Sequence, residues 1–92
     1  MRLKRFEAKV MAEKVASLEA MVLDLQAMAD ALSKQIAAEE TRTRVVDARR
    51  PDYSIIALAA ATRRAKLRVS LTELKASLEE AKREHVATEN LP

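Results

Sequence analysis

The sequence of 92 residues contains no cysteine, glycine or tryptophan, and it has only one phenylalanine and one tyrosine. Without cysteine there can be no disulfide framework and no thiolate metal site, which agrees with a reducing compartment. Without glycine the chain can form neither a P-loop nor a dinucleotide-binding turn, because both need backbone that approaches phosphate closely. The shortage of bulky aromatic side chains favours a narrow helix-helix seam over a compact globular core.

The sequence also has few groups that could perform acid-base chemistry. His85 is the only histidine, and with no second histidine and no cysteine we interpret it as a tolerated polar position on a helical seam. Glu39 and Glu40, like Glu79 and Glu80, are neighbours in sequence and would point about 100° apart on a helix, so they cannot converge as an acid-base pair. We expect both pairs on a solvated face. The sequence predicts no enzymatic activity, no cofactor, no metal and no small-molecule substrate.

Long apolar runs are missing as well. The longest uncharged segment, residues 53–62, is about half the roughly 20 residues that a membrane span requires. The basic N-terminal residues are not followed by the apolar segment of a signal peptide. These patterns predict a soluble, cytoplasmic protein.

A heptad repeat runs from Met11 to Ile36. Position a carries Val15, Val22, Ala29 and Ile36, and position d carries Met11, Leu18, Leu25 and Leu32. The apolar spacing alternates between four and three residues, and good helix formers fill most other positions. This pattern predicts a coiled-coil helix over about residues 3–44.

Turn signals follow the first heptad segment. The β-branched residues 41, 43, 45 and 46 weaken the helix, and Pro51 disfavours helical backbone at Arg50. We expect a turn over about 45–52, with Asp47, Asp52 and Ser54 as candidate N-caps for a second helix over about 53–89. The seam of that helix reads Ala57, Arg64, Leu71, Leu78 and His85 at a, with Tyr53, Ala60, Leu67, Leu74, Ala81 and Thr88 at d.

The two seams match if the chain folds back on itself. A register in which facing residue numbers add to 96 pairs Ile36 with Ala60, Val22 with Leu74 and Leu18 with Leu78, so that each a position meets a d position. The same register brings Lys14 near Glu84, a flanking pair of opposite charge. We therefore predict an all-α fold, a single antiparallel coiled-coil hairpin over residues 1–92. The alternative is a parallel dimer, which β-branched a positions with Leu at d also favour.

Three groups of residues are candidates for partner binding. The first is the basic start of the chain, with Arg2, Lys4, Arg5 and Lys9. The second is a basic zone early in the second helix, with Arg63, Arg64, Lys66 and Arg68. The third is an apolar group near the turn, with Tyr53, Ile55 and Leu58, which the weak Ala-rich seam does not absorb.

Nearly the whole chain resembles a known family. The residues that carry the resemblance are Asp47, Pro51, Tyr53, the Ala-rich stretch after it, Arg63-Arg64-Ala-Lys-Leu67, Ser70, Leu74, Leu78 and Ala81, together with Leu3-Lys-Arg-Phe6 and Ala37-Ala-Glu-Glu40. This pattern is similar to that of alphaproteobacterial FliJ-type flagellar export proteins. The chain departs from the family pattern at Ser54, where proline is expected.

The resemblance implies a cytoplasmic protein at the base of the bacterial flagellum, part of the type III export apparatus that serves motility. Through that apparatus alone, and so only indirectly, it would meet a membrane. Such proteins resemble the gamma-subunit stalk of rotary ATPases and act as a stalk or general chaperone. The implied partners are the flagellar export ATPase and the export gate protein, with export substrates or their chaperones as further partners. The alternative is a generic coiled-coil adaptor or a basic nucleic-acid-associated helical protein. Nucleic acid is less favoured, because no aromatic residues interleave with the basic ones and the net charge is only +3.

Overall fold

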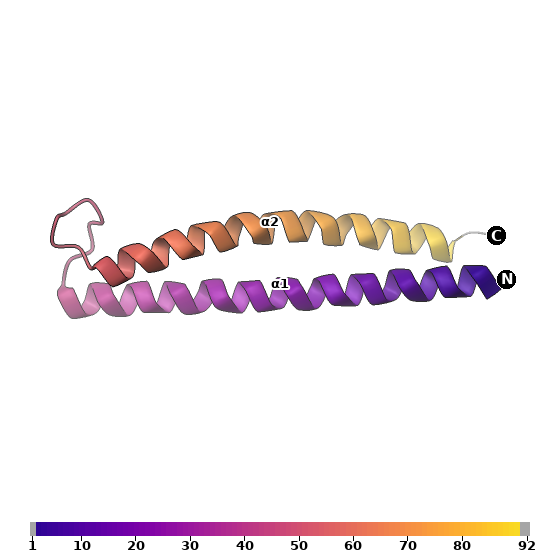
Figure 1. Cartoon of the computed structure of the whole chain (residues 1–92), viewed down its shortest axis with the longest axis horizontal. Helices are drawn as coiled ribbons and strands as arrows, with labels where there is room; N and C mark the ends of the chain where they lie inside the picture. Colours follow the sequence, from indigo (N-terminus) through magenta and orange to yellow (C-terminus); the bar gives the residue numbers. More distant parts are fainter. Residues whose placement is uncertain (1, 91–92) are drawn as a thin grey trace. The chain divides into compact units, whose positions relative to one another are not determined.

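The computed structural model describes residues 2–90, and these form two long α-helices joined by a loop (Figure 1). Helix α1 spans Arg2–Thr43 and helix α2 spans Ile55–Glu89. The prediction of an all-α fold with two long helices packed against each other is confirmed. The chain forms two compact units: unit 1 contains Met1–Asp24 and Leu71–Pro92, and unit 2 contains Leu25–Ser70.

Helix α1 ends at a residue with left-handed backbone. Arg44 has a φ of 61°, and its backbone N–H donates a hydrogen bond of 2.8 Å to the carbonyl of Glu40. This is the geometry of a C-terminal αL cap, a place that glycine usually occupies because it has no Cβ. Val45 follows the cap and is buried. The helix therefore stops one residue before the expected end at about 44, and it does so without a glycine.

Helix α2 begins at a serine N-cap. The Ser54 Oγ accepts a hydrogen bond of 3.1 Å from the backbone N–H of Ala57, and the Ser54 carbonyl accepts the first helical bond, 3.0 Å long, from Leu58. Of the three expected caps, Ser54 is thus the one that starts the helix. Asp47 instead accepts bonds from the backbone and the guanidinium of Arg49 within the loop.

Two glutamates at the end of α1 hold the start of α2. The Tyr53 hydroxyl donates a hydrogen bond of 2.9 Å to Glu40 Oε2, and the Ser54 hydroxyl donates one of 3.2 Å to Glu39 Oε2. The Glu39 side chain retains only 14% of its exposure and also binds Arg42. The expectation that Glu39 and Glu40 lie on a solvated face is therefore wrong, because the folded loop brings donors to both carboxylates.

The core of unit 2 is small and rich in alanine. Ile36, Ala57 and Ala60 are buried together, and Leu32, Tyr53 and Ala61 pack against them. Ile36 and Ala60 are the pair that the predicted register places face to face. Small residues on α2 allow α1 to approach closely, but they bury little apolar area. The leucines of this seam are accordingly only half-buried.

Unit 1 packs the first half of α1 against the second half of α2 in antiparallel order. Among the described residues of unit 1 the buried ones are Leu71, Leu78 and Ala81, all from α2. Lys14 Nζ lies 3.9 Å from a carboxylate oxygen of Glu84, as the predicted register requires. His85 keeps its place on the seam, and its Nε2 lies 3.0 Å from a Glu89 oxygen.

Candidate interaction surfaces

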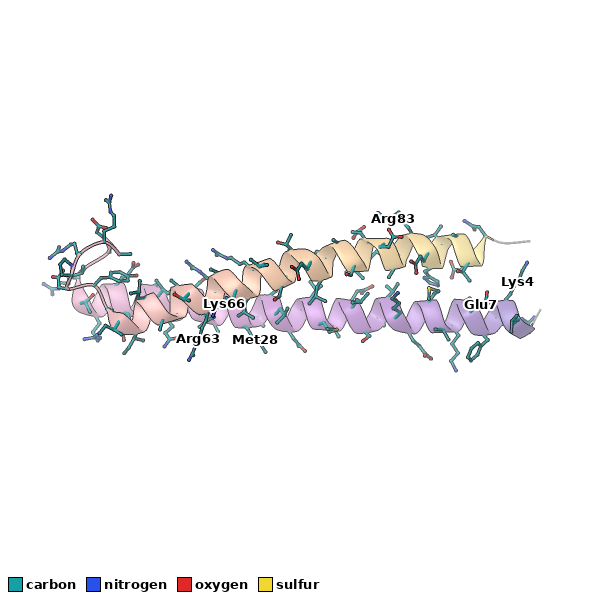
Figure 2. All side chains as sticks on the ribbon, turned by 45° about the horizontal axis from the view of Figure 1, so that its top comes forward. Lys4, Glu7, Met28, Arg63, Lys66 and Arg83 are labelled. Carbon is teal, nitrogen blue, oxygen red and sulfur yellow. The ribbon has the colours of Figure 1, made fainter. Side chains whose placement is uncertain are left out.

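The basic start of the chain belongs to unit 1. Arg5 and Lys9 are exposed, whereas Lys4 is half-buried; the side chain of Arg2 lies outside the described residues. Lys9 lies 4.0 Å from Glu13 in an ion pair whose two side chains are both largely exposed, so water screens it and it adds little stability. Figure 2 shows Lys4 and Glu7 on the first turns of α1.

An apolar groove adjoins these cations. It has a volume of about 450 Å³ and is lined by Phe6, Glu7, Val10 and Met11 from α1 and by Glu84, Ala87 and Thr88 from α2. Phe6 is 64% exposed, which is unusual for a phenylalanine. The start of the chain thus presents apolar side chains as well as positive charge.

The structure divides the predicted basic zone of unit 2. Arg64 is half-buried in the seam, where its Nη1 donates a hydrogen bond of 2.9 Å to Ser33 Oγ. Arg68 is exposed and has an interaction of its own. Arg63 and Lys66 instead lie on the other flank of α2, beside Met28 of α1 (Figure 2). The four residues are therefore not one surface, because successive positions of a helix point about 100° apart.

Arg63 and Lys66 border a second groove, of about 530 Å³, that lies entirely within unit 2. Its other lining residues are Met28, Ala31, Leu32 and Gln35 from α1 and Leu67 from α2. The groove is open to solvent because the side chains of the seam are not all covered. Ala29 and Ile36 are buried, whereas Leu32 and Leu67 are half-buried. Sequence reasoning treated the two leucines as seam residues and did not find the groove; the only signal was Met28, an apolar residue beside the heptad seam.

The carboxylates of unit 2 all have partners. Asp30 accepts a hydrogen bond from Gln26, and the others bind residues of the loop or of the helix ends; they are Glu39, Glu40, Asp47 and Asp52. No carboxylate of the described residues forms an ion pair with Arg63 or Lys66. The positive charge beside the groove is therefore not neutralised within the described chain.

The apolar group near the turn is only partly available. Ile55 is 82% exposed and Leu58 is 51% exposed, but the ring of Tyr53 packs against the core of unit 2. Burial, followed by the hydrogen bond to Glu40, raises the pKa of Tyr53. Val46 in the loop is 73% exposed and is an apolar surface residue that sequence reasoning missed. Ile55, Leu58 and Val46 are thus exposed apolar residues of this region.

Two further features are absent from residues 2–90, namely a candidate metal site and a membrane-spanning helix. This part of the chain has no group of three or more histidine, aspartate or glutamate side chains that could hold a metal ion. None of its helices is both long enough and apolar enough to cross a membrane.

Comparison of the chain with models of protein families, with curated proteins and with solved structures finds no match. The resemblance to FliJ-type proteins thus rests on the residues that carry it in the sequence. At the level of architecture, the chain is a coiled-coil-like helical hairpin.

Proposed function

We propose that this chain is a non-enzymatic coiled-coil component of the flagellar type III protein export apparatus, which binds the export ATPase and the export gate as a stalk or general chaperone. The observation that carries the proposal is the family-like pattern from Asp47 to Ala81, which falls on a helical hairpin with a basic first turn. A stalk needs long helices and charged contacts but no catalytic group of its own.

The basic start of the chain is the part that meets the ATPase in this proposal. Arg5 and Lys9 are exposed, and Lys9 has only a weak, solvated pairing with Glu13. Positive side chains at a helix N-terminus oppose the helix dipole, so helix stability does not account for them. Contact with acidic loops of a ring ATPase does account for them. The exposed apolar residues near the turn, Ile55 and Leu58, serve the second partner, the export gate.

Charge reversal at the start of the chain tests the proposal. The triple variant Arg2→Glu, Lys4→Glu, Arg5→Glu should bind the purified export ATPase at least about tenfold more weakly and should reduce motility, because like charges then face each other. Binding of the parent should weaken as salt is raised. Far-UV circular dichroism should show the same helix content in both proteins.

A matched control reverses three exposed cations elsewhere, with Lys34→Glu, Arg44→Glu and Lys75→Glu. The control changes the net charge equally and should leave ATPase binding within about twofold of the parent. If the N-terminal triple variant stays folded and binds like the parent, the contact is not at this end. If nucleic acid and no ATPase co-purifies with the chain from its native cytoplasm, the nucleic-acid alternative replaces the proposal.

A further inference from the structure

We infer that the groove of unit 2 is a docking site for an amphipathic α-helix that carries acidic side chains along one flank of its apolar stripe. The inference rests on the shape and the charge of this groove. It does not depend on the proposed role in protein export.

The spacing of the lining residues fits a helix as the occupant. On α1 the lining residues are Met28, Ala31, Leu32 and Gln35, which are spaced as i, i+3, i+4 and i+7. On α2 they are Arg63, Lys66 and Leu67, spaced as i, i+3 and i+4. The stripe on α1 is thus about two turns, or roughly 10 Å, long, and the stripe on α2 is about one turn, or roughly 6 Å, long. Two antiparallel stripes of this kind form the groove into which a third helix of a bundle packs.

The floor of the groove is apolar and incompletely covered. Met28 is 53% exposed, and Leu32 and Leu67 stay half-buried although both occupy d positions of the seam. Methionine adapts its shape to different partners, and for this reason it is common at surfaces that bind helices. Leucines that their own hairpin covers only in part become fully buried when a third helix supplies the missing layer.

The charge at the edge of the groove selects the kind of helix. Arg63 and Lys66 are exposed on the α2 side, and no carboxylate in residues 2–90 forms an ion pair with either. On the α1 side the lining residues are uncharged. The opposite side of the seam differs, because there Arg64 is already bonded to Ser33. A helix with glutamate or aspartate on one flank only would pair with both cations while its apolar stripe covers the leucines.

Nucleic acid fits this surface less well. Two cations over an apolar floor provide few phosphate contacts, and no aromatic residue lines the groove for base stacking. A second copy of the chain would have to bring a carboxylate-flanked helix that is free of its own partner. Three carboxylates of α2 in unit 1 are already paired: Glu79 with Lys82, Glu80 with Arg83 and Glu84 with Lys14.

A synthetic helix tests the inference directly. The probe is a fluorescent three-heptad peptide with leucine at a and d, glutamate along one flank, and alanine and glutamine elsewhere; a second peptide carries lysine in place of each glutamate. Fluorescence anisotropy with the full chain should show binding of the glutamate peptide and at least about tenfold weaker binding of the lysine peptide. The double variant Arg63→Glu, Lys66→Glu should reverse this preference.

Two matched controls distinguish binding in the groove from non-specific electrostatic binding and from non-specific hydrophobic binding. Reversal of Lys34 and Arg44, exposed cations of the same unit that do not line the groove, should change binding of the glutamate peptide by less than about twofold. Met28→Glu should abolish binding, whereas Met21→Glu should not, because Met21 is similarly exposed but lies one heptad away in unit 1. Circular dichroism checks that all variants keep their helix content.

Several outcomes would overturn the inference. One is that neither peptide binds; another is that the Lys34 and Arg44 reversal weakens binding as much as the Arg63 and Lys66 reversal. A third is a dimer in sedimentation that only the Arg63 and Lys66 reversal dissociates, which would show that the groove takes a second copy of the chain. A fourth is tight binding of a fluorescent oligonucleotide that the same reversal removes while the glutamate peptide fails to bind.

Discussion

Replacing Arg44 with glycine should stabilise the protein, although glycine usually weakens helical proteins. Arg44 has a φ of 61°, and a residue with a Cβ costs about 1–2 kcal/mol in the left-handed region. Glycine avoids this cost but loses more backbone entropy on folding, by roughly 0.5–1 kcal/mol. The exposed Arg44 side chain has no hydrogen-bond or ion-pair partner in residues 2–90 that would be lost. We therefore expect Arg44→Gly to raise the free energy of unfolding by about 0.5–1 kcal/mol.

The cap itself should survive this substitution. It depends on the backbone N–H of Arg44 and the carbonyl of Glu40, 2.8 Å apart, and glycine retains that N–H. Arg44→Ala keeps a Cβ in the same conformation, so its stability should stay within about 0.5 kcal/mol of the parent. The gain from glycine should therefore come from the backbone conformation and not from removal of the arginine side chain.

Urea denaturation followed by circular dichroism at 222 nm measures the effect. For a chain of this size, a gain of about 1 kcal/mol corresponds to a rise in melting temperature of about 4–8 °C. The matched control is Lys75→Gly, at an exposed position inside α2, which should lower stability by about 1 kcal/mol. The same residue type should thus have opposite effects at the two positions. If Arg44→Gly destabilises the protein as Lys75→Gly does, the left-handed cap is not the conformation that ends α1.

Three further predictions concern the turn and the core of unit 2. Ser54→Ala should lower stability by about 1 kcal/mol through loss of the N-cap, while Ser54→Asp should retain the cap; equal losses in urea denaturation would contradict the capping role. Ile36→Ala should cost about 2–4 kcal/mol because it leaves a void against Ala57 and Ala60, whereas Lys34→Ala, at an exposed position, should cost under about 0.5 kcal/mol. The bonds from Arg49 lower the pKa of Asp47 below its usual 3.8, so its contribution to stability should be present above pH 3.8 and should disappear as the pH falls through the lower native pKa. An NMR titration of Asp47 that returns a value at or above 3.8 would contradict the loop geometry.

The sequence by itself was sufficient for the two helices and for the register in which they match, although it left a parallel dimer as an alternative pairing. An a and d repeat with period 3.5 leaves one apolar stripe on a helix, and only a facing helix can cover such a stripe. The matching of two stripes then set the register, which places Ile36 with Ala60 in one cluster and Lys14 beside Glu84. The absence of glycine and cysteine likewise excludes phosphate loops and disulfides on composition alone.

The details of the surfaces depended on tertiary structure. Glu39 and Glu40 have the sequence pattern of solvated helix positions. Yet Glu39 binds Ser54, 15 residues later in the chain, and Glu40 binds Tyr53, 13 residues later, because the loop brings these donors back to the end of α1. Arg63 and Arg64 are adjacent and chemically alike, yet one borders a groove and the other is bonded to Ser33 in the seam.

The groove itself is a property of two helices together. The heptad pattern states that Leu32 and Leu67 face a partner, but it does not state how completely that partner covers them. Coverage depends on how closely the helices approach and on which side of the seam the small alanines lie. In unit 2 the alanines Ala57 and Ala60 are buried against Ile36, and Leu32 packs against this cluster but stays half-buried, as Leu67 does. Periodicity along one helix therefore determines which residues turn inward, whereas the packing of side chains from both helices determines which of them stay available to a third.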